Sequence, residues 1–433
     1  MITNKTKNYK PRIVEAQIKE ALNAFGAVLI RGPKWCGKTT ISEYFANSAI
    51  YLDDDMKSEE YDLIAKNDPS RFLEGERPHL LDEWQLYPVI WDAVRRSVDR
   101  DEIGKSIYIL TGSFSPKPGA TKHTGSMRIS SVDMETMTLF ESEESSGEVS
   151  FLSLFEENEQ IKGTSKITKD GLTRAMVRGG YPAGVLSAGQ NASIYGKEAL
   201  KSLISVEMSE ALNEKTDEGI TRTMLRSLAR NISAPVRNGT IMEDMSEAGF
   251  PVAESTFYKY FDALKRLFVI REVPSWNPNI RSATSIRSST KKIFNECALA
   301  CAILNLGEGA LSRDYKTRGL MFECLCGKEL SVYAQKYGGT LNYYRDRYGL
   351  ECDYVIHLED GRYGLFECKC GEGFIEEGAK HLNRLERNIL DHIEENPTTT
   401  LEKPACKVLI TDATYALRRE DGVIILPIAC LRD

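Results

Sequence analysis

The sequence predicts a multidomain α/β protein, and three observations lead to this fold class. The chain has 433 residues, which is more than one hydrophobic core usually organises. Between residues 26 and 133, short apolar runs alternate with longer amphipathic runs, a pattern typical of a parallel sheet covered by helices on both faces. From 171 to 270 the pattern is mainly helical, and strand-like runs return after 340.

We therefore expect three domains. Residues 1–145 would contain the parallel sheet, 170–275 a helical region, and 290–433 a mixed α/β domain. The polar, acidic stretch 145–169 is expected to be a linker, or a short helix followed by a linker. The buried strands predicted for the first domain are Ala27–Ile30, Ala49–Leu52, His79–Leu81 and Ile107–Leu110.

Composition narrows the possible function classes. A formal net charge of -7 argues against a protein that coats nucleic acid nonspecifically, although Lys and Arg gather in 222–237, 259–271 and 281–292. No apolar run approaches the length of a membrane span, and residues 1–12 lack a secretory signal's apolar segment, so we expect a cytoplasmic protein without a membrane partner. The ten cysteines lack the usual zinc spacings. They are expected to be reduced thiols, with an iron–sulfur or zinc site built from distant thiols as the alternative.

A phosphate-binding motif follows the first predicted strand. The run Gly32–Thr39 reads GPKWCGKT, matches GxxxxGK[ST], and opens a predicted helix, as this motif requires. Its glycines let backbone N–H groups surround a β-phosphate, Lys38 would reach the β- and γ-oxygens, and the Thr39 hydroxyl would bind Mg²⁺. The predicted nucleotide-binding residues are Gly32, Pro33, Lys34, Trp35, Cys36, Gly37, Lys38, Thr39 and Thr40.

Two further strand ends fit the same chemistry. The strand at His79–Leu81 ends in two carboxylates, of which Asp82 would hold the magnesium and Glu83 would polarise the attacking water. The alternative is a pair of solvated acids. Ser113, after the strand ending at Leu110, could contact the γ-phosphate or position the water. These residues predict nucleoside triphosphate hydrolysis.

These motifs resemble the AAA-type ATP-binding domain of a large prokaryotic family whose members carry a C-terminal domain of unknown function. The resemblance rests on the motifs above and on the runs Asp82–Gln85, Leu110–Ser113, His123–Arg128, Leu139–Glu141 and Arg178–Pro182. It implies that the nucleotide is ATP. It also implies that Arg128 is an arginine finger or sensor, which could act through self-association; the alternative is a surface arginine on a loop. Lys34 and Trp35 depart from the arginine-rich loop common in that family.

The helical region contains the outline of a winged helix-turn-helix. Met242–Gly249 leads through a glycine turn into an amphipathic helix at Glu254–Leu264, and Val269–Val273 would be a wing strand. The apolar positions of the second helix are Phe257, Phe261, Leu264 and Phe268. The polar side chains Tyr258, Lys259, Lys265 and Arg266 would either face DNA phosphates or form a solvated face.

Near the C-terminus, a predicted meander places acidic residues together. Strands at 340–347, 350–358 and 362–369 precede a charged helix at about 376–395 and two strands at 407–411 and 423–428. Side chains two apart share a strand face, so Glu367 and Lys369 point the same way. Asp353 lies on the preceding strand and Glu323 on the helix before the sheet. Carboxylates with a lysine can form a magnesium site with a group that orients water.

This order resembles the PD-(D/E)XK restriction-endonuclease-like fold. The resemblance implies that Glu323, Asp353 and Glu367 bind metal and that Lys369 positions the nucleophile. Cys352 stands where the family has proline. The alternative is that the paired charges form a salt bridge across strands. Likewise, the run Tyr343–Tyr348 would either contact nucleic acid or form a cross-strand ladder.

Two functions follow from this combination. The first is a magnesium-dependent ATPase coupled to a nuclease-like domain that acts on or binds DNA or RNA. The second is a nucleotide-switched regulatory or scaffold protein that binds nucleic acid or protein without cleavage.

Overall fold

The computed structural model describes residues 9–101, 104–112, 125–157, 160–187, 189, 191–277, 288–346, 349–396 and 399–433. The chain divides into two compact units. The first comprises residues 1–136 together with 210–213 and 262–268, and the second comprises the remainder. No helix in the described ranges is long and apolar enough to cross a membrane.

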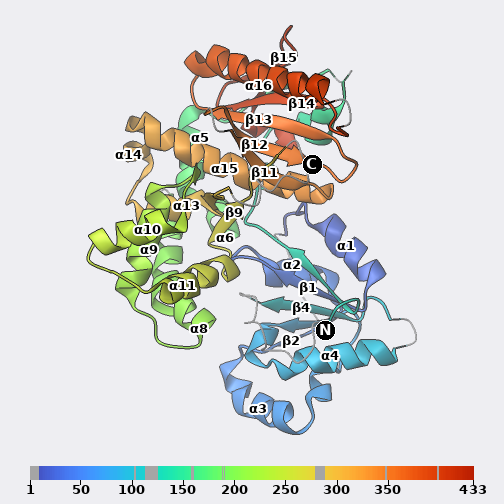
Figure 1. The fold of residues 1–433 in the computed structure, drawn as a ribbon. Helices are drawn as coiled ribbons and strands as arrows, with labels where there is room; N and C mark the ends of the chain where they lie inside the picture. Colours follow the sequence, from blue (N-terminus) through green and yellow to red (C-terminus); the bar gives the residue numbers. More distant parts are fainter. Residues whose placement is uncertain are drawn as a thin grey trace. The chain divides into compact units, whose positions relative to one another are not determined.

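The first unit is built around a parallel sheet of five strands in the order β2-β3-β4-β1-β5 (Figure 1). Its strands are β1 (Ala27–Arg31), β2 (Ser48–Tyr51), β3 (His79–Asp82), β4 (Tyr108–Gly112) and β5 (Ile129–Asp133). Its helices are α1 (Glu15–Ala24), α2 (Lys38–Phe45), α3 (Ser58–Asn67) and α4 (Val89–Arg100). The four predicted strands are confirmed, and the sheet gains β5.

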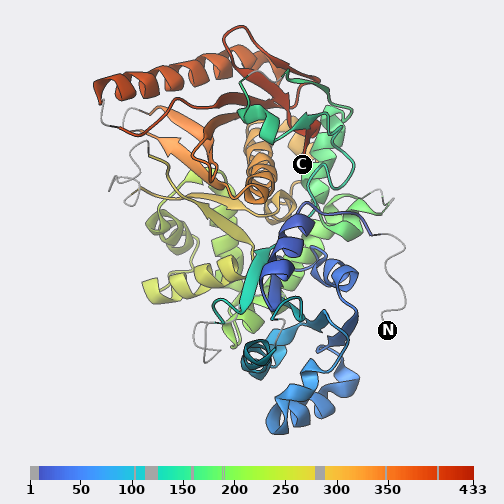
Figure 2. The same ribbon diagram turned by 90° about the vertical axis from the view of Figure 1, so that its right-hand side faces the viewer.

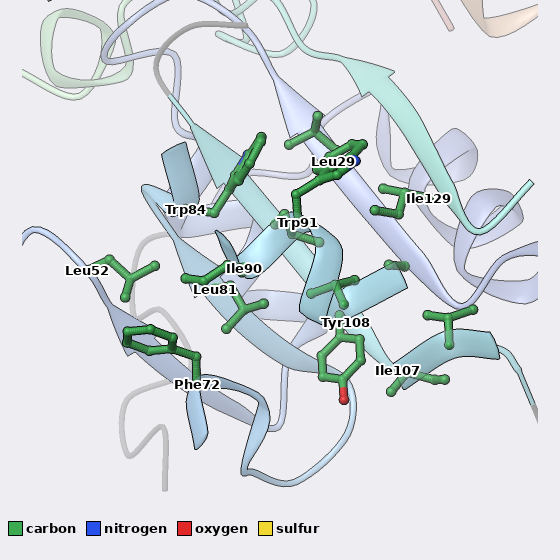
Figure 3. Packing of buried hydrophobic residues seen from close by; sticks show 14 of the residues in the cluster. Leu29, Leu52, Phe72, Leu81, Trp84, Ile90, Trp91, Ile107, Tyr108 and Ile129 are labelled. Carbon is green, nitrogen blue, oxygen red and sulfur yellow. The ribbon is translucent and has the colours of Figure 1, made fainter. Parts of the chain in front are cut away.

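Apolar side chains cover both faces of this sheet. Leu29 of β1 packs in one buried cluster, whereas its neighbours Val28 and Ile30 pack in another, because successive side chains of a strand point to opposite faces. Figure 3 shows the first cluster. In it the rings of Trp84 and Trp91 contact each other in a tilted arrangement, with centroids 4.9 Å apart and planes at 31°. The continuous apolar runs of the sequence therefore correspond to strands buried on both sides.

The segment 169–294 contains helices and a small sheet of three strands in the order β8-β10-β9. Most of this segment belongs to the second unit, whereas its residues 210–213 and 262–268 belong to the first. The helices are α5 (Lys169–Arg178), α6 (Pro182–Val185), α7 (Ser193–Ser202), α8 (Met208–Leu212), α9 (Glu218–Arg230), α10 (Asn238–Glu247) and α11 (Glu254–Arg266). The strands are β8 (Ala234–Pro235), β9 (Ile270–Val273) and β10 (Lys291–Phe294). The predicted core positions Phe257, Phe261 and Leu264 are buried. Phe268 was wrongly assigned to the same helix, because the chain leaves α11 after Arg266 and turns with a positive φ at Phe268.

A seven-stranded mixed sheet dominates the rest of the second unit, in the order β11-β12-β13-β14-β16-β15-β7. The strands of this sheet are β11 (Thr340–Arg345), β12 (Glu351–His357), β13 (Tyr363–Lys369), β14 (Cys406–Thr411), β15 (Tyr415–Arg418), β16 (Ile424–Pro427) and β7 (Lys162–Thr164). A further strand, β17 (Leu431–Arg432), lies outside this sheet and pairs separately. The helices are α13 (Cys297–Ile303), α14 (Glu308–Arg313), α15 (Tyr315–Lys336) and α16 (Ile375–Glu395). Strands β11, β12 and β13 form the predicted antiparallel meander, and β14 runs parallel to β13. Helices α15 and α16 cover opposite faces of the sheet (Figures 1 and 2).

The stretch 145–169 was expected to be a linker, or a short helix followed by a linker. It contains a short 3₁₀ helix at Leu152–Phe155 and also contributes two strands to this unit. β6 (Val149–Ser150) pairs with β17, and β7 (Lys162–Thr164) pairs with β15 at the edge of the large sheet. The strands are too short to show a periodic pattern, and their partners lie more than 200 residues away in the sequence. Local composition therefore indicated a linker, but long-range pairing decided the structure.

Candidate functional site

The loop between β1 and α2 has the tight geometry that its glycines predict. Gly37 caps α2 in the left-handed region with φ 101°, which glycine adopts without steric cost. A Cβ atom at Gly32 would lie 2.0 Å from the Met134 carbonyl oxygen, so only glycine fits there. The first backbone N–H groups of α2 are oriented toward the loop, as in other helix N-termini that bind anions.

Lys38 folds back over this loop. Its ammonium donates hydrogen bonds to the carbonyl oxygens of Gly32, at 3.0 Å, and Pro33, at 2.9 Å, and its side chain is buried. The positively charged Lys38 ammonium therefore lies against the loop that precedes the N-terminus of α2.

The end of β3 meets the start of α2 at a buried carboxylate. The Thr39 hydroxyl lies 3.1 Å and 3.2 Å from the two carboxylate oxygens of Asp82, and the Thr111 hydroxyl also donates to Oδ1 of Asp82. Strand β4 lies between β1 and β3, which brings Thr111 to the site. Burial raises the pKa of Asp82 to about 6, although the hydrogen bonds from Thr111 and Thr39 oppose this shift.

Thr111 was missed in the sequence, where Ser113 was chosen instead. The sequence signal that points to Thr111 is its place at the end of an apolar run, because a polar side chain in a fully buried strand needs a hydrogen-bond partner. Ser113 lies outside the described residues, so its predicted contact with the γ-phosphate stays a prediction.

Glu83 lies next to Asp82 and is held by a neighbour that the sequence did not identify. Its backbone adopts a left-handed conformation with φ 53°, which begins a short 3₁₀ turn. The Gln85 side-chain amide donates a hydrogen bond to Oε2 of Glu83. A Cβ at Gly112 would lie 2.2 Å from Oε1 of Gln85, so this glycine leaves space for the Gln85 side chain.

Arg12 supports the phosphate-binding loop from outside the motif. Its guanidinium donates to the carbonyl oxygens of Cys36, at 2.9 Å, and Glu135, at 2.7 Å, and the side chain is buried. Cys36 is fully buried as well, and burial raises the pKa of its thiol, so it packs as a small apolar side chain.

Other predicted residues of this site lie at the surface. Trp35 is 46% exposed and the Lys34 ammonium lies 5.6 Å from its ring centroid, while Thr40 is exposed. The Arg128 guanidinium lies 2.7 Å from an Asp99 carboxylate oxygen. An arginine-finger role for Arg128, and the self-association that it needs, stay predictions.

The four residues predicted near the C-terminus come together, with two partners that the sequence did not reveal. Lys369 lies 2.9 Å from Oε1 of Glu367, which also contacts Nδ1 of His381 on α16 at 3.2 Å. Lys291 of β10 lies 2.6 Å from Oε1 of Glu323 and 3.7 Å from Oδ1 of Asp353. Lys291 also donates to the Asp353 carbonyl oxygen at 2.9 Å. We call these six residues the carboxylate cluster.

Burial and pairing shift the pKa values within the carboxylate cluster in opposite directions. Burial raises the pKa of Glu323 and Asp353, and the nearby Lys291 only partly offsets that effect. Burial acts in the same direction on Glu367, but His381 and Lys369 outweigh it and lower the pKa of this carboxyl. The hydrogen bond to Glu367 raises the pKa of His381.

The predicted metal site built from Glu323, Asp353 and Glu367 does not fit this arrangement. The ammonium of Lys291 lies between Glu323 and Asp353, within ion-pair distance of both. Throughout the described ranges, no group of three His, Cys, Asp or Glu side chains could hold a metal ion. A zinc or iron–sulfur site built from distant thiols, the alternative considered for the cysteines, therefore also has no set of ligands within the described ranges.

Several predicted nucleic-acid contacts have partners within the chain. Lys259 pairs with Glu214, and Arg266 donates to the Ala211 carbonyl oxygen at 2.8 Å. Tyr343 is buried, and its hydroxyl donates a hydrogen bond to the Ser289 carbonyl oxygen. Tyr258 is 41% exposed, and Lys265 is also exposed.

Comparison with known proteins covers most of the chain. Residues 24–143 match a family described as an AAA domain. Residues 169–310 and 318–431 match two families described only as domains of unknown function, DUF8612 and DUF4143. Uncharacterized proteins of Mycobacterium bovis and Mycobacterium tuberculosis are each 23% identical over 361 residues, which is 83% of this chain and 73% of theirs.

Solved structures also align with more than half of this chain. The Walker-type ATPase of Pyrococcus abyssi aligns over 70% of this chain and 100% of its own, with 14% identity and a TM-score of 0.42. The AMPPCP-bound DnaA of Aquifex aeolicus aligns over 60% of this chain and 90% of its own, with 14% identity and a TM-score of 0.29. The family match and the geometry of the loop agree: the first unit contains an AAA-type P-loop domain, and the chain is an ATPase.

Proposed function

We propose that this ATPase depends on magnesium and that its nucleotide state controls nucleic-acid binding by the second unit. One observation carries the proposal for the first unit. The Thr39 hydroxyl and the Asp82 carboxylate meet within hydrogen-bond distance, beside a buried lysine held by the glycine loop. A chance match to the motif would not bring a strand end 43 residues away to the same place.

The donor set fits magnesium with a triphosphate. Hydroxyl and carboxylate oxygens are the ligands that Mg²⁺ prefers, and it usually keeps only one or two protein ligands next to phosphate. Thr39 and Asp82 would hold the ion. When bound, magnesium would neutralise charge on the phosphate oxygens.

The chain's own residues divide the remaining work. Lys38 carries a positive charge at the loop and would stabilise charge on the phosphate oxygens. Glu83 would orient the attacking water and accept its proton. Gln85 acts on Glu83 as a positioning residue, because its amide donates to the Glu83 carboxylate.

The ATPase proposal is tested by steady-state ATP hydrolysis and by binding of a fluorescent ATP analogue. Lys38→Ala should abolish hydrolysis and weaken binding, whereas Glu83→Gln should keep binding and slow turnover by about 10²- to 10⁴-fold. The exposed residues Lys66 and Glu59 offer matched controls as Lys66→Ala and Glu59→Gln. Normal hydrolysis by Glu83→Gln would show that another group activates the water.

Two features of the second unit support nucleic-acid binding. The order α9, β8, α10, α11, β9, β10 resembles a winged helix. The order α15, β11, β12, β13, α16, β14, with β13 and β14 parallel, resembles the nuclease-like fold. Both folds are used to bind DNA or RNA, with or without cleavage.

A second candidate is a nucleotide-switched scaffold that binds protein. The pairing of Lys259 with Glu214 and of Arg266 with a backbone carbonyl favours it, because these cations already have partners. Fluorescence anisotropy with labelled duplex DNA, single-stranded DNA and RNA, with and without ATP, separates the candidates. Nucleotide-dependent binding supports the first candidate, and no binding to any probe supports the scaffold.

A further inference from the structure

The carboxylate cluster contains its own cation, in the place where a hydrolytic metal would be expected. We propose that Lys291 is this resident cation and that the second unit therefore binds nucleic acid without cleaving it. This inference rests on the nuclease-like fold proposed above, and the metal-binding part of its test does not require that nucleic acid be bound. Removing the Lys291 ammonium should create a site for a divalent cation.

The Lys291 ammonium occupies a pocket built to hold a positive charge. Its side chain is 4% exposed and contacts Glu323, the Asp353 side chain and the Asp353 carbonyl oxygen. The ammonium also lies 4.8 Å from the ring centroid of Tyr354 and 5.9 Å from that of Tyr343, within the range of a cation–π interaction. The Tyr354 hydroxyl donates to the Glu323 carbonyl oxygen at 2.9 Å, which fixes the ring. Carboxylates, a carbonyl and two rings therefore enclose the ammonium.

Electrostatics make simultaneous occupation by a metal unfavourable. Lys291 compensates Glu323 and Asp353, while Lys369 and His381 contact Glu367. A divalent ion at the carboxylates would lie within a few ångströms of the Lys291 ammonium, where repulsion between like charges is strong even at an effective dielectric constant of about 20. Moving the ammonium away would leave two buried carboxylates without their partner.

One carboxylate oxygen of the carboxylate cluster is left without a hydrogen bond in the part of the chain that the structure describes. Oε2 of Glu367 is buried and has no hydrogen-bond partner within the described residues. Glu367 is only 2% exposed. Without Lys291, the Glu323 and Asp353 carboxylates and the Asp353 carbonyl oxygen, which surround the ammonium, would supply the oxygen ligands that hard divalent cations require.

The chain offers a matched control for this lysine. Lys292 is the next residue of β10 and is equally buried, at 4% exposed. Its ammonium donates to the Val236 carbonyl oxygen at 2.7 Å and lies 3.9 Å from Glu272, away from the carboxylate cluster. Removing the Lys292 side chain therefore deletes an equally buried ammonium but leaves the Lys291 ammonium in the carboxylate cluster.

The test measures Mn²⁺ binding by electron paramagnetic resonance and by thermal shift, on the nucleotide-free full chain. Every protein carries Thr39→Ala, which weakens metal binding at the P-loop. Lys291→Ala should bind Mn²⁺ at least about 100-fold more tightly than the parent, because a charge a few ångströms away has been removed. Mn²⁺ should also raise its melting temperature. Lys292→Ala should show neither effect, and adding Asp353→Asn to Lys291→Ala should abolish both.

Two outcomes would overturn the inference. One is a parent protein that binds Mn²⁺ as tightly as Lys291→Ala. The other is metal-dependent cleavage of DNA by the wild-type chain that is lost in Lys369→Ala. The cleavage assay needs only the wild type and Lys369→Ala, so the inference can fail even where Lys291→Ala does not fold. Loss of ATP hydrolysis or of oligonucleotide binding, measured on the wild-type chain with its native Thr39, would count against the proposed function and not against the role of Lys291.

Discussion

The Thr111 hydroxyl donates a hydrogen bond to the Asp82 carboxylate across two adjacent strands of the parallel sheet. Thr111 is fully buried and Asp82 is 4% exposed, so the orientation of the carboxylate depends on a residue that the sequence did not single out as functional.

Thr111→Val should reduce ATP turnover while the protein stays folded. Valine keeps the shape of threonine but removes the hydroxyl, and a hydrogen bond to a charged group is worth about 1.5–3 kcal/mol, or roughly 10- to 100-fold in rate. Thr111→Ser keeps the hydroxyl and should retain most activity. Steady-state kinetics at saturating ATP and Mg²⁺ check this, and equal rates for the two variants would count against the role of Thr111.

Gln85→Ala should lower kcat by about tenfold, because a mobile Glu83 spends less time in the orientation that activates water. The KM for ATP should change little, since Gln85 contacts the glutamate and not the phosphate-binding loop. Gln85→Glu tests the mechanism further, because it replaces the donating amide with a like charge and should be slower than Gln85→Ala. An unchanged kcat in both variants would exclude a positioning role.

Arg12→Met should weaken nucleotide binding and destabilise the first unit. The guanidinium connects the backbone of the loop at Cys36 with that of Glu135, and loss of these bonds leaves two buried carbonyl groups unsatisfied at about 1–3 kcal/mol each. Titration with a fluorescent ATP analogue and urea unfolding measure the two effects. Arg100→Met, at an exposed position on α4, is the control.

Glu329 should make the stability of the second unit depend on pH. It is fully buried on α15, and burial raises its pKa from an ordinary 4.5 to about 7, against the opposing effects of Lys328 and of the Leu139 N–H that it binds. The folded state therefore binds more protons than the unfolded state between about pH 4.5 and 7. This contribution to stability is complete below pH 4.5 and is lost as the pH rises through about 7.

Glu329→Gln should remove this dependence, because the amide cannot lose a proton but can still accept from Leu139. Urea unfolding at pH 5 and at pH 7.5, followed by the fluorescence of Trp276 in chains without the other tryptophans, measures the second unit. The exposed substitution Glu395→Gln should leave the pH dependence unchanged. A pH dependence of Glu329→Gln identical to that of the wild type would contradict the assignment.

Local sequence determined the elements whose signals lie within a few residues. The GPKWCGKT run at Gly32–Thr39 predicted the loop because glycines and a following helix are intrinsic to phosphate binding. The apolar runs predicted β1 to β4, because a strand buried on both faces is continuously apolar. Alternation predicted the meander from β11 to β13, because burial on one face repeats every second residue. The same alternation brought Glu367 and Lys369 to one face, where they pair.

Tertiary structure alone decided which distant groups meet. Strands β6 and β7 are too short to leave a pattern, and their pairing partners lie in the last 20 residues of the chain. Thr111 contacts Asp82 because their strands are adjacent in the sheet, and the residue types do not specify this strand order. Gln85 contacts Glu83 because the chain turns after Glu83, and the residue types do not specify this turn either. Lys291 illustrates the limit most clearly. It lies 32 residues before Glu323 and 62 before Asp353, and only the packing of β10 against α15 and β12 places its ammonium between their carboxylates.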